Sequence, residues 1–245
     1  MSGLVNGFLS YAKALPYLLK GWALKYLVLT GILAIASLAV MVGIVFFKGD
    51  ELVHVVLNLF NLDLIPWLDT GLEWVVRGIL WVICILLFKY LILILASPFL
   101  SIVSNKVESA INGESVQATN EEGFMGLGRA VSVSGGNLIN EILLTIPLLI
   151  FSLIPGVAIV TTPLIFIIQA YYVGYGNLDT YLENKFSTKE SKSFVKGNRG
   201  LAVANGSVFL GLLLIPFLGV FLAPIWSIIA VTIAGESKLR QQATV

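Results

Sequence analysis

The first half of the chain contains two long apolar stretches. Residues 26–47 carry no charged side chain, and residues 78–105 carry a single one, Lys89. About 20 apolar residues in a helix cross the roughly 30 Å hydrocarbon core of a bilayer. The pattern therefore predicts two transmembrane helices that cross the membrane completely.

The second half contains two further uncharged stretches, at residues 142–178 and 201–235, and each is interrupted by proline. Each is too long for one crossing, and a central break leaves two arms of roughly 12 to 15 residues. Twelve residues of helix rise only about 18 Å, which is part of the way across. We expect two hemi-penetrating helical hairpins that return to the side from which they entered.

The prolines of the two hairpins recur at the same spacing. Pro155 precedes Pro163 as Pro216 precedes Pro224, and the second pair lies 61 residues after the first. Backbone groups released at a hinge need partners, so these hinges should be buried in protein or face water. The expected hinge residues are Pro155, Gly156, Pro163, Pro216, Gly219 and Pro224. The alternative to a repeated hairpin is two unrelated kinked helices.

Segments of mixed polarity separate these stretches. Residues 1–25 combine three lysines with many leucines, which is typical of a helix lying at a membrane surface. Pro66 divides residues 48–77 into two short amphipathic helices at the opposite interface, and residues 106–141 are predicted to form a loop and an amphipathic helix. Together these elements predict an all-α integral membrane protein that forms a single domain over residues 1–245.

Composition agrees with a membrane protein. The 245 residues are 58% hydrophobic and 12% charged, whereas soluble domains carry about 25% charged residues. Cys84 is the only cysteine, so an internal disulfide is impossible.

The distribution of charge predicts the orientation. If each hairpin returns to its own side, then both termini and residues 104–141 and 179–200 share one side, with twelve of the fifteen Lys and Arg residues. Residues 48–77 carry two basic residues against five acidic ones. Positive charge favours the cytoplasmic side, so both termini are expected in the cytoplasm.

The sequence offers little for catalysis. His54 is the only histidine, and no His/Cys cluster has metal-ligand spacing. We predict a protein that is not an enzyme, needs no cofactor or metal, and has no nucleic-acid partner.

Two lysines are candidates for anion transport. Lys89 is the only charge within a predicted span. Such a lysine either lines a pathway or is paired or extended toward the interface. Lys25, next to Tyr26 at the start of the first span, is either an anion-binding group or an ordinary cytoplasmic anchor.

Other charges flank the apolar stretches. The basic run from Lys185 to Arg199 is typical of a patch that faces lipid headgroups, and it would also raise the local anion concentration. Glu108 and Asp179 are candidates for pairing with these cations or for lining a pathway.

Three regions suggest a family. They are Ala96-Ser97-Pro98-Phe99 leading into Asn105-Lys106-Val107-Glu108, the stretch from Tyr175 to Lys185, and the two proline hinges. In these regions the chain resembles the CysZ family of bacterial sulfate permeases, which is related to the eukaryotic etoposide-induced membrane proteins. The resemblance extends from about Tyr11 to Leu239.

The resemblance implies two spanning helices, two hemi-penetrating hairpins, a homo-oligomer in the bacterial inner membrane, and sulfate uptake that supplies cysteine synthesis. Members tend to carry a Gly-Leu-Arg-Arg-like element before the first span, associated with sulfate binding. Here this element falls on Trp22, Ala23, Leu24 and Lys25. Only the last is cationic, and lysine lacks the planar fork of arginine. The implied substrate-binding residues are Trp22, Leu24, Lys25 and Tyr26.

The leading hypothesis is therefore an inner-membrane permease or channel for sulfate or a related oxyanion. One alternative is a membrane-shaping or scaffold protein, whose hairpins wedge the lipid and which conducts no solute. The other is a transporter of a different solute.

Overall fold

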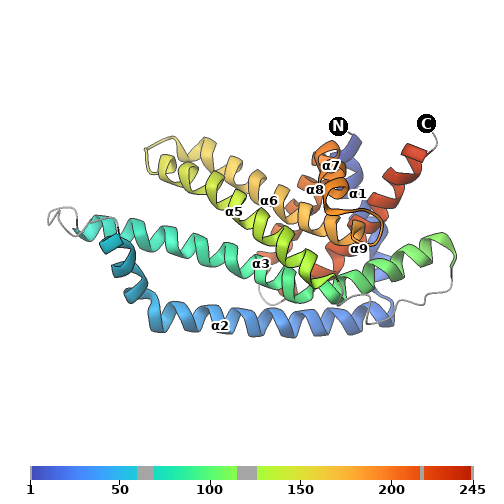
Figure 1. Ribbon diagram of the computed structural model, residues 1–245, viewed down its shortest axis with the longest axis horizontal. Helices are drawn as coiled ribbons and strands as arrows, with labels where there is room; N and C mark the ends of the chain where they lie inside the picture. The colour runs from blue at the N-terminus through green and yellow to red at the C-terminus, as the bar shows by residue number, and fades with distance from the viewer. Residues whose placement is uncertain (1, 60–68, 115–125, 216–217, 244–245) are drawn as a thin grey trace.

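The computed structural model describes residues 2–59, 69–114, 126–215 and 218–243, and these residues form helices without any strand (Figure 1). The helices are α1 (Ser2–Leu18), α2 (Gly21–Leu59), α3 (Asp69–Asn112), α5 (Leu127–Ser152), α6 (Ala158–Leu182), α7 (Thr188–Gly197), α8 (Arg199–Leu213) and α9 (Leu218–Ala243). Five of them are long and apolar enough to cross a membrane: α2, α3, α5, α6 and α9. The chain is an all-α, multi-pass membrane protein.

The two predicted spans lie within α2 and α3, but both helices extend further than expected. The prediction of two separate short helices in residues 48–77 is wrong, because its described parts are the end of α2 and the start of α3. Helix α2 continues past residue 47, where Lys48 pairs with Glu51 at 2.7 Å one turn later. The helix bends away near its end (Figure 1). Pro66 lies outside the described residues.

The arms of the two predicted hairpins are unequal. Helices α5, α6 and α9 have 26, 25 and 26 residues, so the expected length of 12 to 15 residues is wrong for these three arms. Only α8, with 15 residues, has the expected length. In Figure 1, α5 and α6 run side by side toward the end of the molecule at which α2 ends and α3 begins.

The turn between α5 and α6 lies at the first predicted hinge. Pro155 and Gly156 are in this turn, and Gly156 has a φ of 84°, which glycine adopts without the steric cost of a Cβ. Pro163 and Pro224 are not in turns; they lie inside α6 and α9. Pro216 lies outside the described residues.

Gly219, in the first turn of α9, permits a close approach of two backbones. A Cβ on this residue would lie 1.9 Å from the carbonyl oxygen of Leu212, near the end of α8. The glycine therefore allows α8 and α9 to meet tightly.

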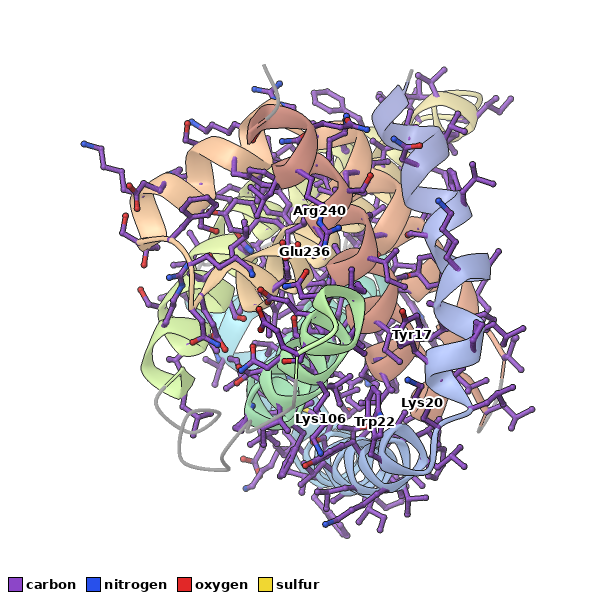
Figure 2. All side chains as sticks on the ribbon, turned by 90° about the vertical axis from the view of Figure 1, so that its right-hand side faces the viewer. Tyr17, Lys20, Trp22, Lys106, Glu236 and Arg240 are labelled. Atoms are coloured by element: carbon purple, nitrogen blue, oxygen red, sulfur yellow. The ribbon has the colours of Figure 1, made fainter. Side chains whose placement is uncertain are left out.

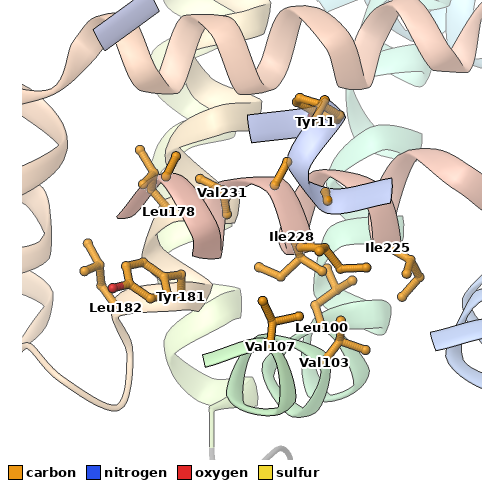
Figure 3. Packing of buried hydrophobic residues seen from close by; sticks show 14 of the residues in the cluster. Tyr11, Leu100, Val103, Val107, Leu178, Tyr181, Leu182, Ile225, Ile228 and Val231 are labelled. Carbon is orange, nitrogen blue, oxygen red and sulfur yellow. The ribbon is translucent and has the colours of Figure 1, made fainter. Parts of the chain in front are cut away.

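Helix α9 is the centre of the structure. Its most apolar stretch is 67% buried, against 28% for the corresponding stretch of α6. Figure 3 shows Ile225 and Ile228 of α9 in one cluster with Leu100 and Val103 of α3. The N-terminal helix belongs to this core as well, because the ring of Tyr11 meets Trp226 edge-on at 5.9 Å. Helix α1 therefore packs against the bundle, in addition to any contact that it makes with the membrane surface.

Small residues bring α6 and α8 into close contact. A Cβ on Gly174 would lie 1.8 Å from the carbonyl oxygen of Ala202, and one on Gly206 would lie 1.8 Å from that of Ala170. Each helix therefore presents two small residues four positions apart, the pattern that lets membrane helices approach closely. Beside this contact, Asn177 donates a buried hydrogen bond of 2.8 Å to Asn205.

Candidate functional site

The structure divides the predicted substrate-binding residues between two sides of α2. Tyr26 is buried and Trp22 is half-buried, and they lie one turn apart on the face toward α3. Leu24 and Lys25 are exposed on the outer side. These four residues therefore do not form one binding cluster.

Lys106, near the C-terminal end of α3, is the cation that faces the two aromatic rings. Its Nζ lies 5.6 Å from the ring centroid of Tyr26 and 6.0 Å from that of Trp22. An ammonium group within about 6 Å of an aromatic ring is attracted by the ring electrons. Lys20, in the link between α1 and α2, makes a similar contact with Tyr17 at 4.9 Å.

A pocket of about 510 Å³ lies at the same end of the molecule, between α1, α3 and α9, and Tyr17 is part of its wall. It is lined by Lys13, Tyr17, Ile111, Ile233, Glu236, Ser237 and Arg240. Figure 2 shows this end of the molecule, with Lys20, Trp22 and Lys106 near the start of α2 and with Glu236 and Arg240 on α9. We call Lys13, Lys20, Lys106 and Arg240, together with the rings of Tyr17, Trp22 and Tyr26, the basic mouth.

Glu236 is the acidic side chain in the pocket, and cations surround it. Its Oε1 accepts hydrogen bonds from the Tyr181 hydroxyl at 2.8 Å and from Lys185 Nζ at 3.2 Å, and Arg240 Nε lies 3.8 Å from its Oε2. Lys185 also pairs with Glu108. The two carboxylates are thus neutralised. Lys13, Lys20 and Lys106, which have no ion-pair partner among the described residues, set the charge of the basic mouth.

Asp179, on the last turns of α6, is held by Arg129 of α5. The guanidinium donates two bonds to the carboxylate, from Nε at 3.0 Å and Nη2 at 2.7 Å, and Ser191 of α7 donates a third at 2.5 Å. Arg129 Nη1 also donates to the carbonyl oxygen of Phe186 at 2.5 Å. This cluster joins α5, α6 and α7 at one end of the bundle. Nearby, burial raises the pKa of Glu183 to about 7, and the charge of Asp179 adds to this shift.

Lys89 is buried and paired, and it does not extend toward an interface. Its Nζ lies 2.5 Å from Oε1 of Glu141 on α5, and the side chains of the pair are 4% and 0% exposed. The hydroxyl of Tyr90 donates to the other carboxylate oxygen at 2.7 Å. A buried ion pair therefore joins α3 and α5 within the apolar part of the protein.

The chain matches a known family of membrane proteins over most of its length. The family model described as sulfate transporter CysZ/etoposide-induced protein 2.4 matches residues 10–224, which is most of the chain. The chain belongs to this family. The CysZ/etoposide-induced protein family is a membrane-protein family with a transporter among its members and is not an enzyme family. No curated protein matches the chain.

The sequence of this CysZ-family chain did not indicate the contacts of two residues, Lys106 and Arg129. Lys106 was placed in a loop because the charge at this position ended the apolar stretch, yet α3 continues to Asn112. Arg129 was not singled out, because nothing in the sequence indicates that it meets Asp179 fifty residues later. Among the residues that the structure describes, no group of three His, Cys, Asp or Glu side chains is arranged to hold a metal ion.

Proposed function

We propose that this CysZ/etoposide-induced-family protein is a permease for sulfate or a related oxyanion, and that the basic mouth is where the anion enters. The observation that carries the proposal is the position of Lys106, which lies over Trp22 and Tyr26 at the same end of the molecule as a pocket lined by Lys13 and Arg240. The pocket volume is within the range of about 300–1,000 Å³ that is usual for small-ligand sites.

The lysines of the basic mouth have charge to offer an anion. Among the described residues, no carboxylate lies within ion-pair distance of Lys13, Lys20 or Lys106. Clustered cations at an apolar wall raise the local concentration of anions. Lys25, exposed on the outer side of α2, would add to this field without belonging to the same cluster.

The proposal includes the location and orientation of the protein. We infer the bacterial inner membrane, cytoplasmic termini, a role in supplying sulfur for cysteine synthesis, and a homo-oligomer in contact with membrane lipid. The end of the molecule at which α2 ends and α3 begins supports this orientation. There Lys48 pairs with Glu51 and Arg77 pairs with Asp50 at 2.9 Å, so neither basic residue gives that end an excess of positive charge. The two termini lie on the same side of the molecule (Figure 1).

The proposal is tested by uptake of labelled sulfate into liposomes that contain the purified protein, with empty liposomes as the blank. We expect uptake above the blank, and a reduced rate for Lys25→Ala, because the charge of Lys25 adds to the field that attracts the anion. Uptake that is unchanged in Lys25→Ala would leave the permease function standing and show that Lys25 does not contribute to the field that attracts the anion. No uptake by folded, inserted protein would favour another solute or the scaffold function.

A further inference from the structure

A stripe of polar side chains runs along the buried face of α5. Asn137, Glu141 and Thr145 are spaced four residues apart, so they lie above one another on one face of the helix. Their residues are 6%, 0% and 0% exposed. Polar groups at such depth are costly in a membrane protein and are usually retained for a function.

The hydrogen bonds of this stripe are unbalanced in favour of donors. Within the described part of the chain, Asn137 Nδ2 and Thr145 Oγ1 have no hydrogen-bond partner. Lys89 has three N–H groups, and the one hydrogen bond found for it in the described structure goes to Glu141. Each oxygen of Glu141 already accepts one bond, from Lys89 or from Tyr90. A buried cation with N–H groups to spare suits an anion that is rich in oxygen atoms.

From this imbalance we propose that the interface of α3 and α5 holds a second oxyanion-binding site, centred on Lys89, with Tyr90 and Thr145 as further donors. The inference rests on the proposed permease function and adds a deep site to the basic mouth. Lys89 lies 17 residues before Lys106 on α3, which is about 25 Å along the helix. An anion that enters at Lys106 therefore meets a second cation well inside the membrane.

Glu141 keeps this site occupied when no anion is present. Its carboxylate receives the hydrogen bonds of Lys89 and Tyr90, the same donors that an incoming oxyanion requires. Carboxylate and oxyanion therefore compete for one set of donors, and the anion binds only when Glu141 moves aside. This competition keeps Lys89 neutralised between transport events.

Two substitutions distinguish a binding site from a purely structural ion pair. Glu141→Gln removes the competing charge and keeps the size of the side chain. It should lower the KM for sulfate uptake by about tenfold, the ratio that corresponds to one charge-assisted hydrogen bond. Thr145→Val removes an unpartnered hydroxyl and should raise the KM several-fold without lowering the melting temperature. A structural pair predicts that Thr145→Val is as active as the wild type.

The matched control is Glu51→Gln, which alters the exposed Lys48–Glu51 pair in the same way. Binding is also measured apart from transport, as the increase in melting temperature of the detergent-solubilised protein on addition of sulfate. The increase should be larger for Glu141→Gln than for the wild type and for Glu51→Gln. The wild type could import no sulfate while Glu141→Gln still shows the larger increase in melting temperature. That result would support the deep binding site and refute the permease function. An equal increase in all three proteins, with an unchanged KM in both α5 variants, would overturn the site.

Discussion

The buried pair of Lys89 and Glu141 allows a sharp prediction about stability. Lys89→Met keeps most of the length of the side chain and removes its charge. Glu141 then retains the bond from Tyr90 and loses its cation, although its side chain is fully buried. The double variant Lys89→Met/Glu141→Leu removes both charges and fills the same space with apolar atoms.

The expected magnitudes follow from this burial. Breaking a buried ion pair by removing one partner costs about 3–5 kcal/mol, because the other charge stays buried without compensation. Replacing both partners with apolar residues of similar size is often neutral or stabilising by about 1–4 kcal/mol. We therefore expect Lys89→Met to be strongly destabilised and the double variant to regain most of the stability of the wild type. The double variant should remain about 1–3 kcal/mol short of what full replacement of the pair would give, because the buried Tyr90 hydroxyl loses its acceptor.

The measurement is the free energy of unfolding in mixed micelles of a mild detergent and SDS. The control is Lys48→Met/Glu51→Leu, which removes a pair whose side chains are 60% and 66% exposed and should change stability little. Equal stability of Lys89→Met and the wild type would refute the reasoning, since it would mean that the Glu141 carboxylate is solvated or neutral.

Three further predictions concern packing, protonation and the end of the bundle. Gly174→Ala places a methyl group against the Ala202 carbonyl and should cost about 1–3 kcal/mol in the same assay, whereas Gly211→Ala, with open space around it, should not destabilise. Because the pKa of Glu183 is raised to about 7, the folded state binds its proton more tightly than the unfolded state. Stability should therefore fall as pH rises between about 4.5 and 7, by at most about 1.4 kcal/mol per pH unit, and Glu183→Gln should remove this slope. Arg129→Lys keeps the charge but cannot donate two parallel bonds to Asp179, so hydrogen exchange in α7 should become faster by mass spectrometry.

The sequence predicted those elements whose signal is local. Residues 26–47 and 78–105 are uncharged or nearly so over the length of a crossing, and hydropathy alone identifies such spans. The length of α5 was not predictable in this way, because the charge of Glu141 ended the apolar stretch at residue 142. In the structure Lys89 neutralises that charge inside the bundle, so the helix continues through it. Asp179 and Glu236 likewise ended the predicted apolar stretches before the ends of α6 and α9.

The candidate site was predictable only in part. The sequence placed Trp22 and Tyr26 at the start of the first span, where the structure has them. It assigned Lys25 to the same site because the family element falls on residues 22–25, yet neighbouring residues of a helix point in different directions. The lysine that meets the rings, Lys106, comes from another helix. Contacts between helices depend on packing, which no single stretch of sequence encodes.

The most direct test of the basic mouth is sulfate uptake into liposomes by Lys106→Ala, compared with Lys238→Ala. Both substitutions remove one lysine, and Lys238, on α9, bonds Gln241 at 3.3 Å and takes no part in the mouth. We predict that Lys106→Ala reduces the uptake rate at low sulfate by about tenfold or more, the loss that corresponds to one charged hydrogen bond, and that Lys238→Ala leaves it unchanged. Equal uptake by both variants and the wild type would contradict the account and place the entry of the anion elsewhere.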